Sequence, residues 1–229
     1  MIEPHMNKRL LTGIGLLVAV LGAFWLVSPP PPPSELEGQA LTDLPWQVGL
    51  PGDGTSRVLG LTLGEATLAD AVVRYGSPDG AGLFQGERGR SLEAYFSTVR
   101  LAGLEGRLVL TLAAAPEELD RAATRAVGAE RLASGATRFT LSPEDKGGLS
   151  GRRITGISYL PKYKGLEAAF FRERLGEPVA WREIDERSVL WLYPERGLTL
   201  LISSADGAVF EYVPPRDFVL PPDVTLAEP

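Results

Sequence analysis

A long uncharged hydrophobic run near the N-terminus constrains this chain more than any other feature. It extends from Leu10 to Val27 and consists almost entirely of apolar or small residues. In a helix it would span roughly 27 Å, close to the thickness of a bilayer's hydrocarbon core. Lys8 and Arg9 directly precede it, which by the positive-inside rule predicts a cytoplasmic N-terminus. We therefore expect residues 1–9 to form a cytoplasmic tip and residues 10–27 a transmembrane anchor.

The residues after this run look like a spacer. Pro29–Pro33 favour a stiff polyproline II segment, and the whole of residues 28–54 resembles a proline-rich linker. We expect a single-pass protein of the inner membrane whose folded part lies in the periplasm. A cleaved signal peptide stays open as the alternative, with a weak cleavage position near Gly22 or Ala23.

The overall charge limits the class of partner. The chain has 23 Lys and Arg residues against 29 Asp and Glu residues, a formal net charge of −6. An acidic chain without a stripe of basic residues is poorly suited to nucleic acid or to docking on anionic lipid. We expect protein partners in the bacterial envelope or inner membrane, contact with the membrane through Leu10–Val27, and no nucleic acid.

Residue types used in common catalytic and metal sites are missing from the folded part. The chain has no cysteine, and its one histidine, His5, precedes the hydrophobic run. Nucleophilic sites that depend on histidine, and zinc sites that use histidine or cysteine, therefore lack their usual groups. The glycine motifs of nucleotide-binding loops are also absent. We expect no enzymatic activity, no catalytic residue, no cofactor and no metal.

Carboxylates remain as candidate chemical groups. Glu183, Asp185 and Glu186 cluster just before a predicted strand, and a pair of acids can hydrolyse a glycosidic bond. Arg182 and Arg187 interleave with these acids, and nothing apolar beside them would raise a carboxyl pKa. We prefer a solvated loop here, with a carboxylate-dependent glycan hydrolase as a less favoured alternative.

The folded region shows one order of elements twice. A strand-like segment is followed by an amphipathic helix that stops at a glycine with a proline two residues later, at Gly76–Pro78 and at Gly176–Pro178. The helices are expected near 68–75, 116–127 and 166–175, and a further short helix starts at 142–145. The expected strands are 57–63, 91–96, 108–112, 137–141, 153–159, 188–193, 198–202 and 208–213.

These elements predict an α+β fold. After the transmembrane helix we expect two repeated units, each a helix packed on a small antiparallel sheet. The first unit covers residues 55–141, the second covers residues 142–218, and residues 219–229 form an extended tail.

The second unit resembles the small SmpA/OmlA-type domain, also called BamE-like, of bacterial envelope proteins, and the first unit looks like a more degenerate copy. The resemblance implies an α+β envelope domain that binds proteins without catalysis. Members are usually lipoproteins of the outer-membrane assembly machinery, whereas this chain has no lipid-attachment cysteine. The matching segments are Gly176–Pro178, Trp191–Tyr193, the strand after them and Asp206-Gly207 before Val209, with Gly76–Pro78 and Tyr95-Phe96 in the first unit.

Late aromatic residues and a charged turn are the candidate contact site, since tryptophan and tyrosine dominate many interfaces. We expect a non-enzymatic accessory or scaffold protein. A small-ligand or lipid-binding module, which would need an open apolar pocket, remains the alternative. The predicted partner-binding residues are Trp191, Tyr193, Glu195, Arg196, Tyr212 and Phe218.

Overall fold

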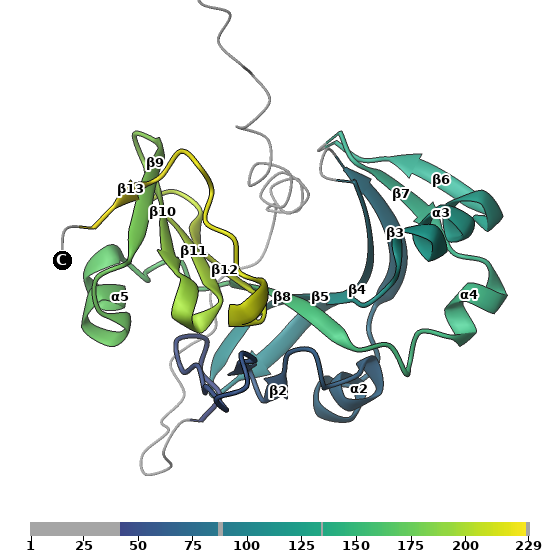
Figure 1. The fold of residues 1–229 in the computed structure, drawn as a ribbon, viewed down its shortest axis with the longest axis horizontal. Helices are drawn as coiled ribbons and strands as arrows, with labels where there is room; N and C mark the ends of the chain where they lie inside the picture. The colour runs from purple at the N-terminus through teal and green to yellow at the C-terminus, as the bar shows by residue number, and fades with distance from the viewer. Residues whose placement is uncertain (1–41, 87–88, 134, 228–229) are drawn as a thin grey trace, which may run out of the picture. The chain divides into compact units, whose positions relative to one another are not determined.

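Figure 1 shows a computed structural model of the chain, which describes residues 42–86, 89–133 and 135–227. The described helices are α2 (Leu68–Tyr75), α3 (Pro116–Arg125), α4 (Pro143–Gly147) and α5 (Ala168–Leu175), with 3-10 turns η1 (Pro194–Arg196) and η2 (Pro215–Asp217). The strands are β1 (Arg57–Val58), β2 (Leu61–Thr62), β3 (Gly80–Gly86), β4 (Gly89–Leu101), β5 (Leu104–Leu112), β6 (Gly128–Arg131), β7 (Thr137–Thr140), β8 (Ile154–Pro161), β9 (Ala180–Asp185), β10 (Ser188–Tyr193), β11 (Leu198–Ser203), β12 (Gly207–Tyr212) and β13 (Thr225–Leu226).

Most of these strands belong to one large antiparallel sheet. Its strand order is β13-β9-β10-β11-β12-β8-β5-β4-β3-β7-β6, and β1 pairs with β2 alone. By chain contacts the described residues divide into two compact units. The larger unit contains residues 42–80, 94–113 and 148–227, and the smaller unit contains residues 81–93 and 114–147.

The central strand of the larger unit is β8. It pairs with β5 on one side and with β12 on the other, so that Tyr159 lies between Leu108 and Phe210. Seven of its eight residues are buried. Its sequence is not a continuous apolar run, because Thr155, Gly156 and Ser158 stand between the apolar residues. β8 therefore joins strands from the two halves of the sequence into one sheet.

This sheet corrects our predicted fold. We expected two repeated units of a helix on a small antiparallel sheet, preceded by a transmembrane helix. That expectation is wrong, because the described strands of both stretches pair within an 11-stranded sheet. The described helices are short, and the longest, α3, has 10 residues. Local sequence patterns indicate where a strand lies but carry little information about which distant strand it pairs with.

The helix ends follow the predicted signals. α2 and α5 end before Gly76 and Gly176, and each glycine N–H donates to a carbonyl of the preceding turn, 2.9 Å away at Val72 and Arg172. At its start, α2 has a capping box in which Thr67 and Asp70 bond each other's backbone N–H groups. These two helix stops are confirmed.

α5 packs on one face of the larger unit's sheet through aromatic contacts. Phe171 is fully buried and its ring centroid lies 5.6 Å from that of Phe210 on β12. The guanidinium of Arg172 lies over the ring of Trp191 on β10, at 4.9 Å from the centroid. These contacts place the start of α5 beside the β9–β10 hairpin.

The segment that leads into β1 is anchored on the larger unit. Asp43 forms an ion pair of 2.6 Å with Arg74 of α2, and Trp46 packs edge-on against Phe170 of α5 at 4.7 Å. The hydroxyl of Tyr212 donates to the backbone carbonyl of Pro45. This segment is therefore part of the folded larger unit.

The smaller unit combines β3, β6, β7 and the first part of β4 with α3 and α4. Leu83 of β3 is buried, opposite Phe139 of β7. Arg90 at the start of β4 pairs with Asp120 of α3, and Arg125 of α3 pairs with Asp145 of α4. These partly exposed ion pairs connect the helices to each other and to the sheet.

Across residues 42–86, 89–133 and 135–227, no helix combines the length and the apolar character needed to cross a membrane. A spanning helix needs about 20 apolar residues. This finding corrects our prediction of a single-pass inner-membrane protein with a periplasmic domain, and we no longer assign that location. The predicted anchor Leu10–Val27 and the proline spacer Pro29–Pro33 lie outside the described residues.

Candidate functional site

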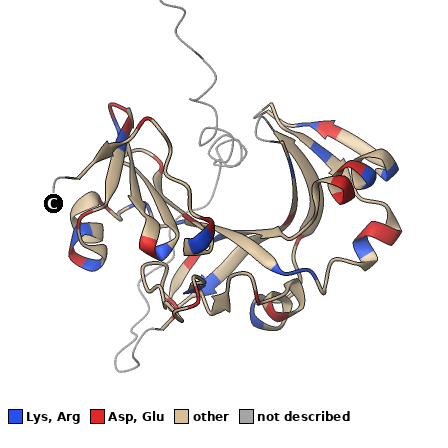
Figure 2. Cartoon of the chain, viewed as in Figure 1, with Lys and Arg blue, Asp and Glu red and all other residues tan. Residues whose placement is uncertain are grey.

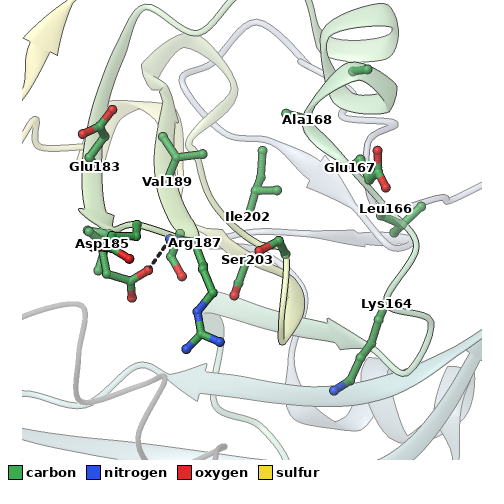
Figure 3. Close-up of a pocket in the computed structure, with 15 residues that line it drawn as sticks. Lys164, Leu166, Glu167, Ala168, Glu183, Asp185, Arg187, Val189, Ile202 and Ser203 are labelled. Atoms are coloured by element: carbon green, nitrogen blue, oxygen red, sulfur yellow. Dashed lines mark hydrogen bonds between the residues drawn. The ribbon is translucent and has the colours of Figure 1, made fainter.

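A groove opens in the larger unit between the start of α5 and the β9–β10 hairpin, as Figure 3 shows. Its volume is about 1130 Å³. Its walls and floor come from three segments of the chain. These segments are the residues that enter α5, the β9–β10 hairpin and the end of β11. The lining residues are Lys164, Leu166–Ala169, Glu183–Val189 and Ile202–Ser204.

Backbone contacts fix the hairpin wall of the groove. Glu183 of β9 pairs with Val189 of β10, and the register then shifts at the hairpin tip. Within the tip the Arg187 N–H donates to Asp185 Oδ1 at 2.8 Å. The Ser204 N–H donates to the Arg187 carbonyl at 3.0 Å, which ties the tip to the end of β11. The side chains of this wall therefore project from a well-supported hairpin.

The opposite wall is the segment that enters α5. Leu166 is buried, with 5% of its surface exposed, and it anchors this segment on the sheet. Glu167 is the N-cap residue of α5, but its side chain makes no capping hydrogen bond. Lys164 Nζ donates to the Ala205 carbonyl at 3.3 Å. The Glu167 carboxylate therefore faces solvent on the wall across from the hairpin.

The groove has an apolar floor and a charged rim. Leu166, Val189 and Ile202 supply apolar surface, and Figure 3 shows Ile202 between the two walls. Figure 2 shows acidic and basic residues together at the hairpin tip. Acids outnumber bases around the rim, with Glu167, Glu183, Asp185 and Glu186 against Lys164 and Arg187.

The rim acids lie in polar surroundings. All four are exposed to solvent. A hydrogen bond from the Arg187 backbone N–H holds the pKa of Asp185 below its usual value. A general acid of a glycoside hydrolase needs the opposite change, a raised pKa, which burial in apolar surroundings produces. The groove therefore offers fixed negative charge and polar contacts rather than a proton donor.

Metal binding has no visible basis in the described part of the chain. There, no three histidine, aspartate or glutamate side chains come together in an arrangement that could hold a metal ion. The four rim acids are divided between the two walls of the groove, as the labelled Glu167, Glu183 and Asp185 in Figure 3 illustrate.

No family model matches this chain. No curated protein and no solved structure matches it either. The resemblance of the second stretch to the SmpA/OmlA (BamE-like) domain accordingly stays a prediction, carried by the sequence segments that suggested it.

Three of the six predicted partner-binding residues lie in the core. Trp191 and Tyr193 are each 4% exposed, and Tyr212 is 1% exposed. Tyr193 donates its hydroxyl to the Gly176 carbonyl at 3.0 Å, and burial raises its pKa to about 12. Trp191 and Tyr193 contact α5 or its end, Tyr212 stacks on Phe210, and all three present little surface to a partner.

The other three predicted residues lie nearer to solvent. Glu195 of η1 is exposed, whereas Arg196 and Phe218 are half-buried. Arg196 Nη1 donates to the Leu175 carbonyl at 2.8 Å, which connects η1 to the end of α5. None of the six lines the groove. Their partner-binding role stays a prediction.

The sequence pointed to part of the groove but assigned it a different structure. Glu183, Asp185 and Glu186 all line it, yet the segment that we predicted as a loop is strand β9 and its turn. Glu167 and Lys164 on the facing wall were missed, since nothing local in their sequence shows that they face the hairpin. A usable signal existed in Trp181 and Ile184, which are residue types enriched in strands and stand just before the turn.

Proposed function

We propose that this chain is a non-enzymatic accessory protein that binds a partner protein through the groove between α5 and the β9–β10 hairpin. The observation that carries the proposal is the combination of an apolar floor with an exposed, mainly acidic rim. Protein contact sites typically combine an apolar centre with a polar rim. The supported backbone of the hairpin gives such a surface a defined geometry.

The same groove fits a small ligand or a lipid less well. Small-molecule sites are typically concave, mostly apolar and about 300–1,000 Å³ in volume, and they enclose most of the ligand. Charged side chains stand on both walls of this groove. A polypeptide segment with polar groups and one or two apolar side chains matches it better.

A glycan hydrolase is also less well supported. The rim acids are exposed, and a backbone hydrogen bond from Arg187 lowers the pKa of Asp185. Such an enzyme needs one carboxyl that stays protonated until it donates to the leaving group. Binding through fixed negative charge requires no proton transfer and agrees with the environment of these residues.

Charge reversal in the groove tests the proposal. The groove variant carries Glu183→Lys and Glu186→Lys, and the matched control carries Glu65→Lys and Glu117→Lys, two exposed acids outside the groove. Each tagged full chain is used to capture partners from cells of the source organism, with quantitative mass spectrometry as the measurement. We expect at least one protein to be captured by the wild type and the control, and about tenfold less by the groove variant.

Two further measurements make the result decisive. Circular dichroism and thermal unfolding should show that both variants remain folded, because all four substituted acids are exposed. If every captured protein is recovered equally by the groove variant and the control, the groove is not the binding site. If the wild type captures nothing beyond an empty-tag control, the accessory-protein proposal fails.

A further inference from the structure

The outer edge of β9 carries a short strand from the chain's own C-terminal segment (Figure 1). In β13, Thr225 pairs with Trp181 and Leu226 pairs with Ala180. The Ala227 N–H also donates to the Val179 carbonyl at 2.9 Å. This edge therefore accepts an extended segment as an antiparallel strand.

Pairing along this edge stops after two residue pairs. In the register of β13, Pro222 and Pro221 would lie opposite Ile184 and Asp185. Proline has no N–H to donate to a sheet, so the tail is unable to continue the ladder there. Among the described residues, no strand pairs with the outer side of β9 between Arg182 and Asp185.

Between Arg182 and Asp185 the outer edge of β9 has no pairing strand among the described residues, and three of these four residues are charged. Ile184 is the large apolar residue of this part and is 40% exposed, whereas Val179 and Leu226, 47% and 64% exposed, lie where β13 pairs. Natural proteins usually protect an open edge with charges, proline or a covering segment, because it pairs readily with another strand. Here the covering segment protects only the first third of β9.

One side chain on this edge has a specific chemical preference. Arg182 is largely buried, with 13% of its side chain exposed, and it forms an ion pair with Asp223 of the tail. Its Nε is buried without a hydrogen-bond partner in the described structure. A largely buried guanidinium whose Nε lacks an acceptor favours a segment along β9 that brings a carboxylate to it.

We propose that the outer edge of β9 binds an extended segment of a partner protein, which pairs antiparallel along Ala180–Asp185 and displaces β13. The segment has no proline over six residues, an apolar residue opposite Ala180 and a carboxylate that reaches Arg182. The binding mode is strand addition, in which backbone hydrogen bonds supply affinity and side chains supply specificity. This inference goes beyond the groove, because it concerns the backbone edge of the sheet.

Two synthetic peptides and the full chain test this proposal. The tail peptide has the sequence of residues 219–227, and the edge peptide is the same with Pro221→Thr and Pro222→Val. A full-chain variant, Thr225→Pro, weakens β13 by removing a backbone donor. Fluorescence anisotropy measures binding of each labelled peptide. We expect the edge peptide to bind the Thr225→Pro chain about tenfold more tightly than the tail peptide binds that chain. We also expect the edge peptide to bind the Thr225→Pro chain about tenfold more tightly than it binds the wild-type chain.

The controls separate this proposal from the groove. Val219→Pro, at a tail residue that is 82% exposed and outside β13, should bind the edge peptide as the wild type does. A second control carries Glu186→Lys alone, at a groove residue beyond the end of β9, and should also bind the edge peptide as the wild type does. The proposal is overturned if the edge peptide binds all chains equally, if it binds none, or if Glu186→Lys abolishes its binding.

Discussion

Buried tyrosine hydroxyls hold loops of the larger unit in place. Tyr75 donates to the carbonyl of Leu59 and Tyr212 to that of Pro45. Burial raises the pKa of both hydroxyls, so that they remain protonated donors. Tyr212, which we predicted as a partner contact, therefore has a clear structural role. Its ring also stacks on Phe210, with centroids 6.2 Å apart.

Removing the Tyr212 hydroxyl should lower the stability of the chain. Tyr212→Phe leaves the Pro45 carbonyl without its donor, so we expect a loss of about 1–3 kcal/mol in the free energy of unfolding. Urea denaturation measures this change. Tyr163→Phe, at a ring that is 57% exposed, is the control and should be close to neutral. Equal effects of the two substitutions would contradict the role given to Tyr212.

Glu93 of β4 should make stability depend on pH. Desolvation raises its pKa above the ordinary value of 4.5, while a hydrogen bond from Ser91, at 2.6 Å, opposes the change. A raised carboxyl pKa means that folding favours the protonated form, so its contribution to stability is lost as pH rises above the unfolded value. Glu93→Gln removes this charge and keeps the acceptor oxygen for Ser91.

We therefore expect Glu93→Gln to be more stable than the wild type near pH 7 and equal to it near pH 4. Thermal unfolding of both chains across that range measures the difference. A constant difference between the two chains at every pH would mean that Glu93 does not titrate as described.

At the scale of single elements, the two helix stops have one backbone conformation. Gly76 has φ 84° and ψ −172°, and Gly176 has φ 77° and ψ −174°. This region is essentially restricted to glycine, which explains why the Gly-x-Pro pattern predicted the helix ends correctly. At both positions an added Cβ would meet no neighbour within 4 Å, so any cost of substitution is conformational.

Alanine at these stops should therefore destabilise the chain without creating a clash. We expect Gly76→Ala and Gly176→Ala each to cost about 1–3 kcal/mol in unfolding free energy. Gly151→Ala is the matched control, because Gly151 also has open space around it but no positive φ. Denaturant unfolding of the three variants gives the comparison. A cost at Gly151 equal to that at Gly176 would exclude a conformational cause.

Most individual elements followed from local patterns in the sequence. The predicted strands at 188–193, 198–202 and 208–213 agree with β10, β11 and β12, and the helix begun at Pro116 is α3. Strand β9 was missed because its charged residues, Arg182 to Asp185, resemble a solvated turn. Those charges are tolerated since β9 lies near the sheet edge, where one side is exposed.

At the scale of the whole molecule, local patterns were insufficient. The pairing of β8 with both β5 and β12 joins residues far apart in the chain, and no single segment encodes that choice. The insertion of α3, β6, β7 and α4 into a separate compact unit likewise depends on packing. The groove could not be predicted for the same reason, because Glu183 and Glu167 come to lie on its opposite walls only after the sheet and α5 have packed.

The central claim is that the groove contacts a partner protein, and site-specific photocrosslinking tests it most directly. A photoreactive amino acid replaces Ala169, which lines the groove and is exposed, or Val73 of α2, which is 89% exposed and lies outside the groove. We expect irradiation of cells to give a crosslinked product from position 169 and none from position 73. Products of equal yield from both positions, or a product from position 73 alone, would contradict the claim.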